Sequence, residues 1–391
     1  MRTIVIDGVF FQENEWSGIA KYWRTILQEL DITAAAKKDL RVFLLVRGKS
    51  QSLRNAGFEH IHVLPIAYFD PVCALSDFHE LGQLCKALKA AVFVSSYYTL
   101  AYGVPNIGMA YDFIPEAMGW MDNHIWKIKE IYMHSLERSL SISYSTAHAA
   151  SLYYPNLISG DDDIFYPPLS PEECFPYGGD AVRKLRVKYA LNYPFAAVVG
   201  HREDYKNVDL LDQALRSRPS HAKALPLGVV ATAGKPLTPA EIELYQKHFQ
   251  FGVRRVRLDS DEMPIFFRAS EFLFYPSLLE GFGYPVAEAL AQRCPVITTG
   301  ATSIGEILVH AQPDDYRIIS GHDGHEALQA FIYMLHSRKR ASAATAQRIQ
   351  SRFGKIEPDR FLQRLFELAS ITALPRTPHL EACLSLDGVL A

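Results

Sequence analysis

Short apolar runs recur along the chain, separated by stretches whose apolar residues fall at helical spacing. Residues 3–6, 41–46 and 107–110 have the length and composition of buried strands. Residues 19–30 carry apolar side chains three and four positions apart, which predicts an amphipathic helix after the first strand. Further strands are expected at 62–66, 91–95, 141–145, 195–199, 227–232, 253–258, 272–275, 296–299 and 316–319. This alternation predicts an α/β fold with parallel sheets.

Residues 160–179 interrupt this pattern. Prolines, glycines and the acidic triplet Asp161 to Asp163 occur there without apolar periodicity, which is typical of a domain boundary. We therefore expect one domain over residues 1–170, a second over 180–357, and a C-terminal helix and tail over 358–391. The triplet is either a metal-binding motif or, more commonly, a run of solvated charges.

Composition narrows the class of protein. The chain has 391 residues, of which 49% are apolar, enough for two cores. A formal net charge of −3 disfavours a nucleic-acid-binding protein. Five cysteines without a C-x-x-C pair disfavour a disulfide framework and a structural zinc site. No apolar run approaches the roughly 18 residues of a membrane span, so a cytoplasmic location is expected.

One segment leaves room for contact with a membrane. Residues 118–140 interleave Trp120 and Trp126 with Lys127 and Lys129. If exposed, such a segment could lie on a membrane or meet a lipid-linked acceptor. A buried amphipathic helix is the commoner case.

Residues 270–306 hold the most informative chemistry. The expected strand 272–275 leads into Glu280-Gly281-Phe282-Gly283, and Pro285 suits the first position of a helix. Glycines let a ligand approach the backbone, and a helix N-terminus attracts phosphate. Glu280 and Glu288 could accept hydrogen bonds from sugar hydroxyls. The alternatives are an ordinary turn with solvated glutamates, or a degraded dinucleotide fingerprint.

Other candidate residues also follow expected strands. Arg202 and Lys206 come after the expected strand 195–199. The planar guanidinium of arginine and the compact ammonium charge of lysine together suit a diphosphate. The alternative is that both are solvent-exposed charges of a loop. Asp112 follows strand 107–110, where it could orient a sugar hydroxyl or cap a turn. Gly18 is the expected first residue of the first helix. It either lets a ligand approach the backbone or simply begins the helix.

These motifs together resemble family 4 of the retaining, GT-B-fold glycosyltransferases. The longest match runs from Tyr275-Pro276-Ser277 through Glu280-Gly281-Phe282-Gly283, Glu288 and Pro295-Val296-Ile297 to Ser303-x-x-Glu306. Shorter blocks are Gly18 to Tyr22, Tyr111 to Glu116 and Val199 to Asn207. The Tyr111 block is similar to that of members that build bacterial surface polysaccharides, many of which carry His where this chain has Tyr111.

The resemblance implies two Rossmann-like domains facing each other across a cleft, with the C-terminal helix packing back on the N-terminal domain. It also implies a cytoplasmic enzyme, with peripheral contact at the inner membrane left open, that needs neither cofactor nor metal. Arg202, Lys206, Glu280 and Asp112 are the expected catalytic residues. The donor-binding set implied is Gly18, Tyr111, Arg202, Lys206, Asn207, Leu258, Met263, Glu280, Gly281, Phe282, Gly283 and Glu288.

The implied reaction moves a sugar from a nucleoside-diphosphate sugar to a glycan or lipid-linked glycan. GDP-mannose is mildly favoured as donor, and the oligomeric state stays open. Two alternatives remain: a non-catalytic protein that binds nucleotides or sugar phosphates, and a dinucleotide-dependent oxidoreductase. Val286 disfavours the oxidoreductase, because it stands where the dinucleotide fingerprint has Gly or Ala.

Overall fold

The chain divides into two compact units in the computed structural model, which describes residues 2–372 and 374 apart from 203, 220 and 233. The described residues up to Pro168 and from Ile356 onward make unit 1, and Leu169–Lys355 make unit 2. The division thus comes at residue 168, slightly before the expected linker midpoint. The tail beyond residue 374, which contains Cys383, lies outside the described residues.

Unit 1 is built on a parallel sheet of six strands in the order β3-β2-β1-β4-β5-β6. Ile4 of the central strand β1 faces Val42 on one side and Val92 on the other. Every residue of β1 after Arg2 is buried. Burial on both faces explains why such strands appear in the sequence as continuous apolar runs. The strands are β1 (Arg2–Asp7), β2 (Leu40–Arg47), β3 (Ile61–Ile66), β4 (Val92–Ser95), β5 (Asn106–Ala110) and β6 (Ser139–Ser141).

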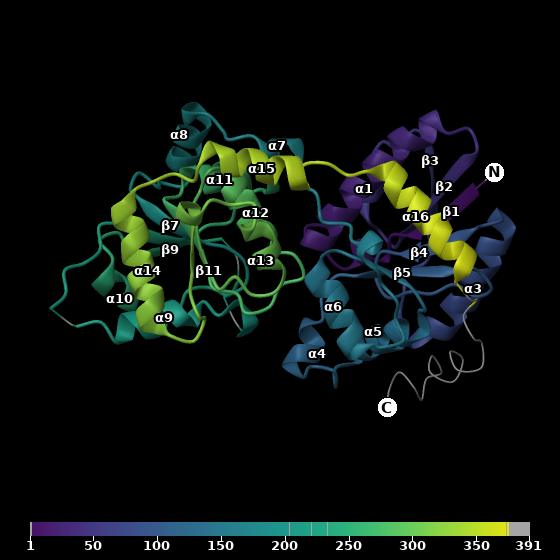
Figure 1. The fold of residues 1–391 in the computed structure, drawn as a ribbon, viewed down its shortest axis with the longest axis horizontal. Coiled ribbons are helices and arrows are strands. Elements are labelled where there is room, and N and C mark those ends of the chain that lie inside the picture. The colour runs from purple at the N-terminus through teal and green to yellow at the C-terminus, as the bar shows by residue number, and fades with distance from the viewer. Residues whose placement is uncertain (1, 203, 220, 233, 373, 375–391) are drawn as a thin grey trace. The chain divides into compact units, whose positions relative to one another are not determined.

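Helices complete unit 1, and the last helix of the chain is among them. They are α1 (Gly18–Ala36), α2 (Gln51–Arg54), α3 (Ala74–Leu88), α4 (Ile114–Met118), α5 (His124–Ser135), α6 (Tyr144–Tyr153) and α16 (Pro358–Ile371). Figure 1 shows α16, in yellow, among the purple and blue elements of this unit, where it contacts α1, β4 and β5. Leu365 and Leu368 of α16 are fully buried.

Unit 2 repeats the architecture with a parallel sheet in the order β12-β11-β10-β7-β8-β9. Its strands are β7 (Phe195–Val198), β8 (Gly228–Ala231), β9 (Val253–Arg255), β10 (Phe272–Tyr275), β11 (Val296–Thr298) and β12 (Tyr316–Ile318). Its helices are α7 (Pro171–Cys174), α8 (Gly179–Lys188), α9 (Asp209–Arg216), α10 (Pro239–His248), α11 (Met263–Ala269), α12 (Tyr284–Ala291), α13 (Ser303–Leu308), α14 (Gly324–Ser337) and α15 (Ala343–Phe353).

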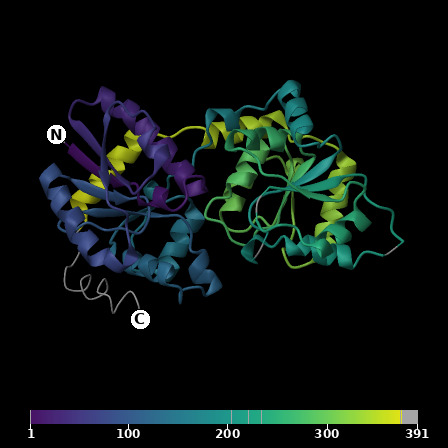
Figure 2. The ribbon, with the colours of Figure 1, turned by 180° about the vertical axis from the view of Figure 1, so that it is seen from behind.

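Helices cover both faces of the unit 2 sheet, as the view from behind shows (Figure 2). On one face, Leu211 of α9 and Phe331 of α14 pack with Phe272 and Phe274 of β10 in one apolar cluster. On the other face, Phe266 of α11 stacks on Phe195 of β7 at 5.4 Å between ring centroids. The sheet is therefore buried on both sides, as parallel sheets require.

Several elements differ from the sequence prediction. The strand expected at 141–145 is β6 at Ser139–Ser141, because the Ser143 hydroxyl accepts a hydrogen bond from the Thr146 amide and begins α6. The strand expected at 253–258 ends at Arg255. Helices α8 and α10 were not predicted, although Thr238 and Glu241 form a capping box that marks the start of α10.

The segment 118–140 contains a helix with a buried face. Ile128, Tyr132 and Met133 of α5 lie in an apolar cluster of unit 1, while Ile125 is exposed. This packing matches the buried amphipathic alternative. Across the described residues, no helix is long and apolar enough to span a bilayer.

Candidate functional site

The two central strands of unit 2 position the candidate site. β7 and β10 are neighbours, and the chain continues from β7 toward one edge of the sheet and from β10 toward the other. Open α/β sheets bind ligands at such a switch point, beyond the carboxyl ends of the strands. The loops that leave this point are residues 199–207 after β7 and 276–283 after β10.

A lysine, a glutamate and a tyrosine meet there. The Lys206 ammonium donates a hydrogen bond to Glu280 Oε1 at 2.6 Å and to the Tyr275 hydroxyl at 2.9 Å. The Tyr275 hydroxyl donates to the same Glu280 oxygen at 2.6 Å. The side chains of Lys206 and Glu280 keep 14% and 10% of their surface exposed, so the pair remains open to solvent on one side.

Tyr275 is buried and stays protonated. Burial raises the pKa of its phenol well above the ordinary value, and the charges of Glu280 and Glu288 raise it further. The hydroxyl is therefore a hydrogen-bond donor at any physiological pH. Glu288, on helix α12, is itself buried.

Backbone and side-chain contacts tie the two loops together. The Leu278 amide donates to the Tyr205 carbonyl at 2.8 Å. The Asn207 amide group donates to the carbonyls of Gly321 at 2.8 Å and Pro276 at 3.3 Å. Asn207 therefore has a structural role here, holding the loop that carries Lys206 against the loop that carries Glu280.

The glycine loop is fixed by α13. The Ser303 hydroxyl donates to the carbonyls of Glu280 and Phe282, and the Glu280 amide donates to the Thr302 hydroxyl at 3.0 Å. Phe282 points into the unit, where its ring meets those of Tyr284 and Phe353. Gly281 and Gly283 are also buried, and Gly283, with φ of +98°, precedes the first turn of α12.

Arg202, which the sequence predicts beside Lys206 at a diphosphate, makes its hydrogen bonds and ion pair outside this cluster. Its guanidinium forms an ion pair with Glu241 of α10 and donates to the Lys235 carbonyl at 2.6 Å. Glu241 itself is a residue that sequence reasoning missed, and the capping box that begins at Thr238 was the available signal. Leu258 lies in the loop after β9, and Met263 is the first residue of α11. Both are half-buried.

The unit 1 candidates have mostly structural partners. The Tyr111 hydroxyl donates its one hydrogen to the Ser96 carbonyl at 2.8 Å and accepts from the Trp23 indole at 2.5 Å. It is 3% exposed, so the expected contact of Tyr111 with a sugar does not fit its position. Asp112 Oδ1 accepts from the Ile114 amide at 3.2 Å, as a turn cap does. Gly18 is the exposed first residue of α1.

The sequence suggested that the acidic triplet is a run of solvated charges, but one of its three residues is buried. Asp163 is buried, and its carboxylate accepts from the Gly160 amide and from Arg364 of α16, both at 2.6 Å. It therefore fixes α16 to unit 1. Within the part of the chain that the structure describes, no three His, Cys, Asp or Glu side chains gather as a metal site.

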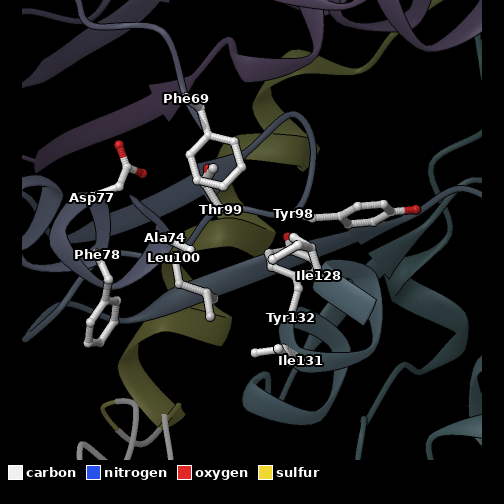
Figure 3. A pocket seen from close by; sticks show the side chains of 10 residues that line it. All are labelled: Phe69, Ala74, Asp77, Phe78, Tyr98, Thr99, Leu100, Ile128, Ile131 and Tyr132. Carbon is white, nitrogen blue, oxygen red and sulfur yellow. The ribbon is translucent and has the colours of Figure 1, made fainter. Parts of the chain in front are cut away.

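A small pocket in unit 1 has different chemistry. Figure 3 shows Asp77 at one side of the pocket, whose lining also includes the rings of Phe69, Phe78 and Tyr98. Arg47 binds Asp77 at 2.7 Å and also the fully buried Asp7. The Asp77 carboxylate is thus held by Arg47 in a mostly apolar wall, which suits neither a diphosphate nor a sugar.

Comparisons with known proteins agree with the chemistry of unit 2. Residues 183–350 match the model of the family described as glycosyl transferases group 1. The chain is 29% identical over 169 residues to O-antigen chain mannosyltransferase B of Escherichia coli, a match over 40% of this chain and 41% of that protein. It is 28% identical over 205 residues to D-inositol 3-phosphate glycosyltransferase of Xylanimonas cellulosilytica, over 50% and 46%. The chain spans less than half the length of each of these curated relatives.

Solved structures of low sequence identity share the fold over almost the whole chain. Anabaena Alr3699/HepE, in complex with UDP and glucose, has a TM-score of 0.62 at 14% identity, covering 95% of this chain and 100% of its own. Sucrose-phosphate synthase from Thermosynechococcus elongatus has 0.65 at 13%, covering 94% and 98%. WaaG, a glycosyltransferase involved in lipopolysaccharide biosynthesis, has 0.61 at 14%, covering 94% and 100%. The chain therefore has the GT-B fold of these structures, and its residues 183–350 are similar to the glycosyl transferases group 1 family.

Proposed function

We propose that the protein is a retaining glycosyltransferase that takes its sugar from a nucleoside-diphosphate sugar. The observation that carries the proposal is the Lys206–Glu280 pair at the switch point of unit 2, beside the N-terminus of α12. A cation and a helix N-terminus suit the diphosphate, and a carboxylate suits the hydroxyls of the sugar. The group 1 family match over the same residues supports the same chemistry.

The paired state describes the site before a donor enters. Lys206 and Glu280 neutralise each other, and a diphosphate offers Lys206 more negative charge than one carboxylate does. Lys206 then turns to the diphosphate and stabilises the charge that grows on it as the sugar leaves. This arrangement supplies positive charge from the chain itself, which supports transfer without a metal. Glu288 is proposed to hold the ribose hydroxyls.

Arg202 is secondary in this proposal. Its guanidinium would have to leave Glu241 and two backbone carbonyls before it reached a phosphate. Lys206, in contrast, already lies beside Glu280. Substitution of Lys206 should therefore reduce transfer more than substitution of Arg202 does.

The names of the relatives support a proposal for the donor and the acceptor. A relative named as an O-antigen chain mannosyltransferase supports GDP-mannose as donor and a glycan or lipid-linked glycan as acceptor. A neighbour solved with UDP keeps uridine open as the base. We propose a cytoplasmic protein that meets a lipid-linked acceptor at the inner membrane surface.

Thermal shifts in EDTA test donor binding. A ligand that binds only the folded protein raises the melting temperature, so one of GDP, UDP, dTDP, ADP or CMP should stabilise it without metal. NAD serves as the control for a dinucleotide enzyme. Stabilisation by NAD alone, or by nucleotides only after a divalent metal is added, would contradict the proposal.

Turnover of the matching nucleotide sugar separates an enzyme from a binding protein. Lys206→Ala should lower turnover by roughly 100-fold, since loss of one preorganised charge stabiliser typically has that effect. Arg202→Ala should lower it less. Lys339→Ala, at a surface pair with Asp314 where both side chains are more than 60% exposed, is the matched control and should change nothing. Near-normal turnover by Lys206→Ala would remove Lys206 from the mechanism, and binding without turnover in the wild type would favour the non-catalytic alternative.

A further inference from the structure

Tyr275 occupies the centre of the Lys206–Glu280 pair. It is the last residue of β10, only 3% exposed, and its hydroxyl touches both partners: it accepts from Lys206 and donates to Glu280 Oε1. The sequence pattern places it simply as an aromatic strand residue. Its hydroxyl nevertheless faces the candidate site.

The tyrosine is held more firmly than either charged partner. The backbone of β10 pairs with β11 and β7, so the Tyr275 ring is fixed by the sheet, whereas Lys206 and Glu280 come from loops. The Lys206 ammonium also lies 5.1 Å from the centre of the Tyr275 ring and 5.0 Å from that of Tyr205. Such contacts with ring faces favour a cation.

We propose that Tyr275 is a positioning residue for the donor sugar, which it serves by holding the Glu280 carboxylate in place when Lys206 turns to the diphosphate. This inference rests on the proposed function. With Lys206 gone, Glu280 would lose one of its two partners on Oε1. The hydroxyl of Tyr275 retains that oxygen, and the other carboxylate oxygen stays directed at the sugar.

The proposal separates two parts of donor binding. The nucleoside diphosphate needs Lys206 and the α12 N-terminus, which Tyr275→Phe leaves in place. The sugar needs an oriented Glu280, which the variant does not have. A hydrogen bond to a charged group contributes enough that its loss should weaken sugar-dependent binding by roughly 10- to 100-fold.

Calorimetric titration of Tyr275→Phe in EDTA tests this separation. The probes are GDP with GDP-mannose and UDP with UDP-glucose, and the pair that binds the wild type is used. We expect the affinity for the diphosphate to stay within about twofold, while that for the nucleotide sugar falls by roughly 10- to 100-fold. Equal losses for both ligands, or no loss for either, would overturn the inference.

Tyr245→Phe is the matched control. Tyr245 of α10 is a buried tyrosine of the same unit whose hydroxyl is bonded to a carboxylate, that of Asp212. This variant loses the same kind of hydrogen bond outside the loops that carry Lys206 and Glu280. It should bind both ligands as the wild type does, and a sugar-specific loss in Tyr245→Phe as well would overturn the assignment to Tyr275.

Crystal structures of Lys206→Ala and of the double variant Lys206→Ala/Tyr275→Phe, both without ligand, test the inference independently, because the first substitution removes the other partner of Glu280 Oε1. If the wild type bound none of the four probes, GDP-mannose and UDP-glucose would be excluded as donors, but this comparison would still decide the role of Tyr275. We expect the Glu280 carboxylate to keep its wild-type position in Lys206→Ala and to leave it in the double variant, where the hydroxyl is missing as well. An unmoved carboxylate in the double variant would show that Tyr275 does not position it.

Discussion

Unit 1 buries a lysine completely, and its partners explain how that charge is accommodated. Lys129 of α5 has no exposed surface; its ammonium donates to Glu116 at 2.7 Å and to the Asp112 carbonyl at 2.9 Å. Tyr154 donates to the second oxygen of Glu116 at 2.9 Å. This lysine, glutamate and tyrosine form a buried counterpart of the unit 2 cluster, and they fix the turn after β5.

Removal of that lysine should be strongly destabilising. Lys129→Met leaves the Glu116 carboxylate buried without its cation, so the free energy of unfolding should fall by about 3–5 kcal/mol. Native-state hydrogen exchange of the β5 amides reports this loss. Lys127→Met, two residues before Lys129 and paired with Glu130 at the surface, should change the free energy of unfolding by less than about 1 kcal/mol. Similar effects of the two substitutions would refute this account of the buried pair.

Sequence reasoning was weakest at predicting which side chains form ion pairs and hydrogen bonds with each other. Lys206 and Glu280 were both expected at the site, but Arg202 pairs with Glu241, 39 positions away. Such a partner depends on how the loop after β7 packs against helix α10, which apolar periodicity does not encode. Tyr275 was missed as a functional residue for a related reason: the pattern of a buried strand does not reveal where a hydroxyl points.

Strands were predicted well at the scale of elements, because each buried parallel strand leaves a continuous apolar run. Every strand that the described residues form overlaps an expected one, with ends displaced by a few residues at most. Helix α10 was missed because its sequence, PAEIELYQKH, has little apolar periodicity. Its capping box, which is local chemistry, would have located its start.

The start of α12 provides a test at this scale. Gly283 has φ of +98°, and a Cβ there would lie 3.2 Å from the Ile304 side chain. Gly283→Ala should therefore lower the free energy of unfolding by roughly 1–2 kcal/mol and weaken nucleotide binding, because a left-handed backbone disfavours side chains. Melting curves with and without the nucleoside diphosphate measure both effects.

Gly57→Ala is the control for backbone strain alone. Gly57 of unit 1 also has a positive φ, of +68°, and no atom lies within 4 Å of the added Cβ. It should lose stability and retain nucleotide binding. If Gly283→Ala also retained full nucleotide affinity, the helix start would have no part in holding the diphosphate.

The whole molecule consists of two units of the same design, each with a six-stranded parallel sheet. α16 belongs to unit 1 although unit 2 precedes it in the chain, and Asp163 and Arg364 link the two segments of unit 1. The α/β class and the repeated architecture followed from the alternation of strands and helices. The family resemblance led us to expect α16 on the N-terminal unit, whereas periodicity alone could not, because a helix's apolar stripe does not say which sheet it covers.

The loops after β7 and β10 are proposed to bind the donor of a sugar transfer. A crystal structure with the nucleoside diphosphate sugar that stabilises the protein tests it most directly. We predict the diphosphate beside the Lys206 ammonium and the N-terminus of α12, with the sugar hydroxyls on Glu280. Lys206 should have left the carboxylate, and the Tyr275 hydroxyl should remain on it. A donor bound elsewhere, with the Lys206–Glu280 pair intact, would contradict the account.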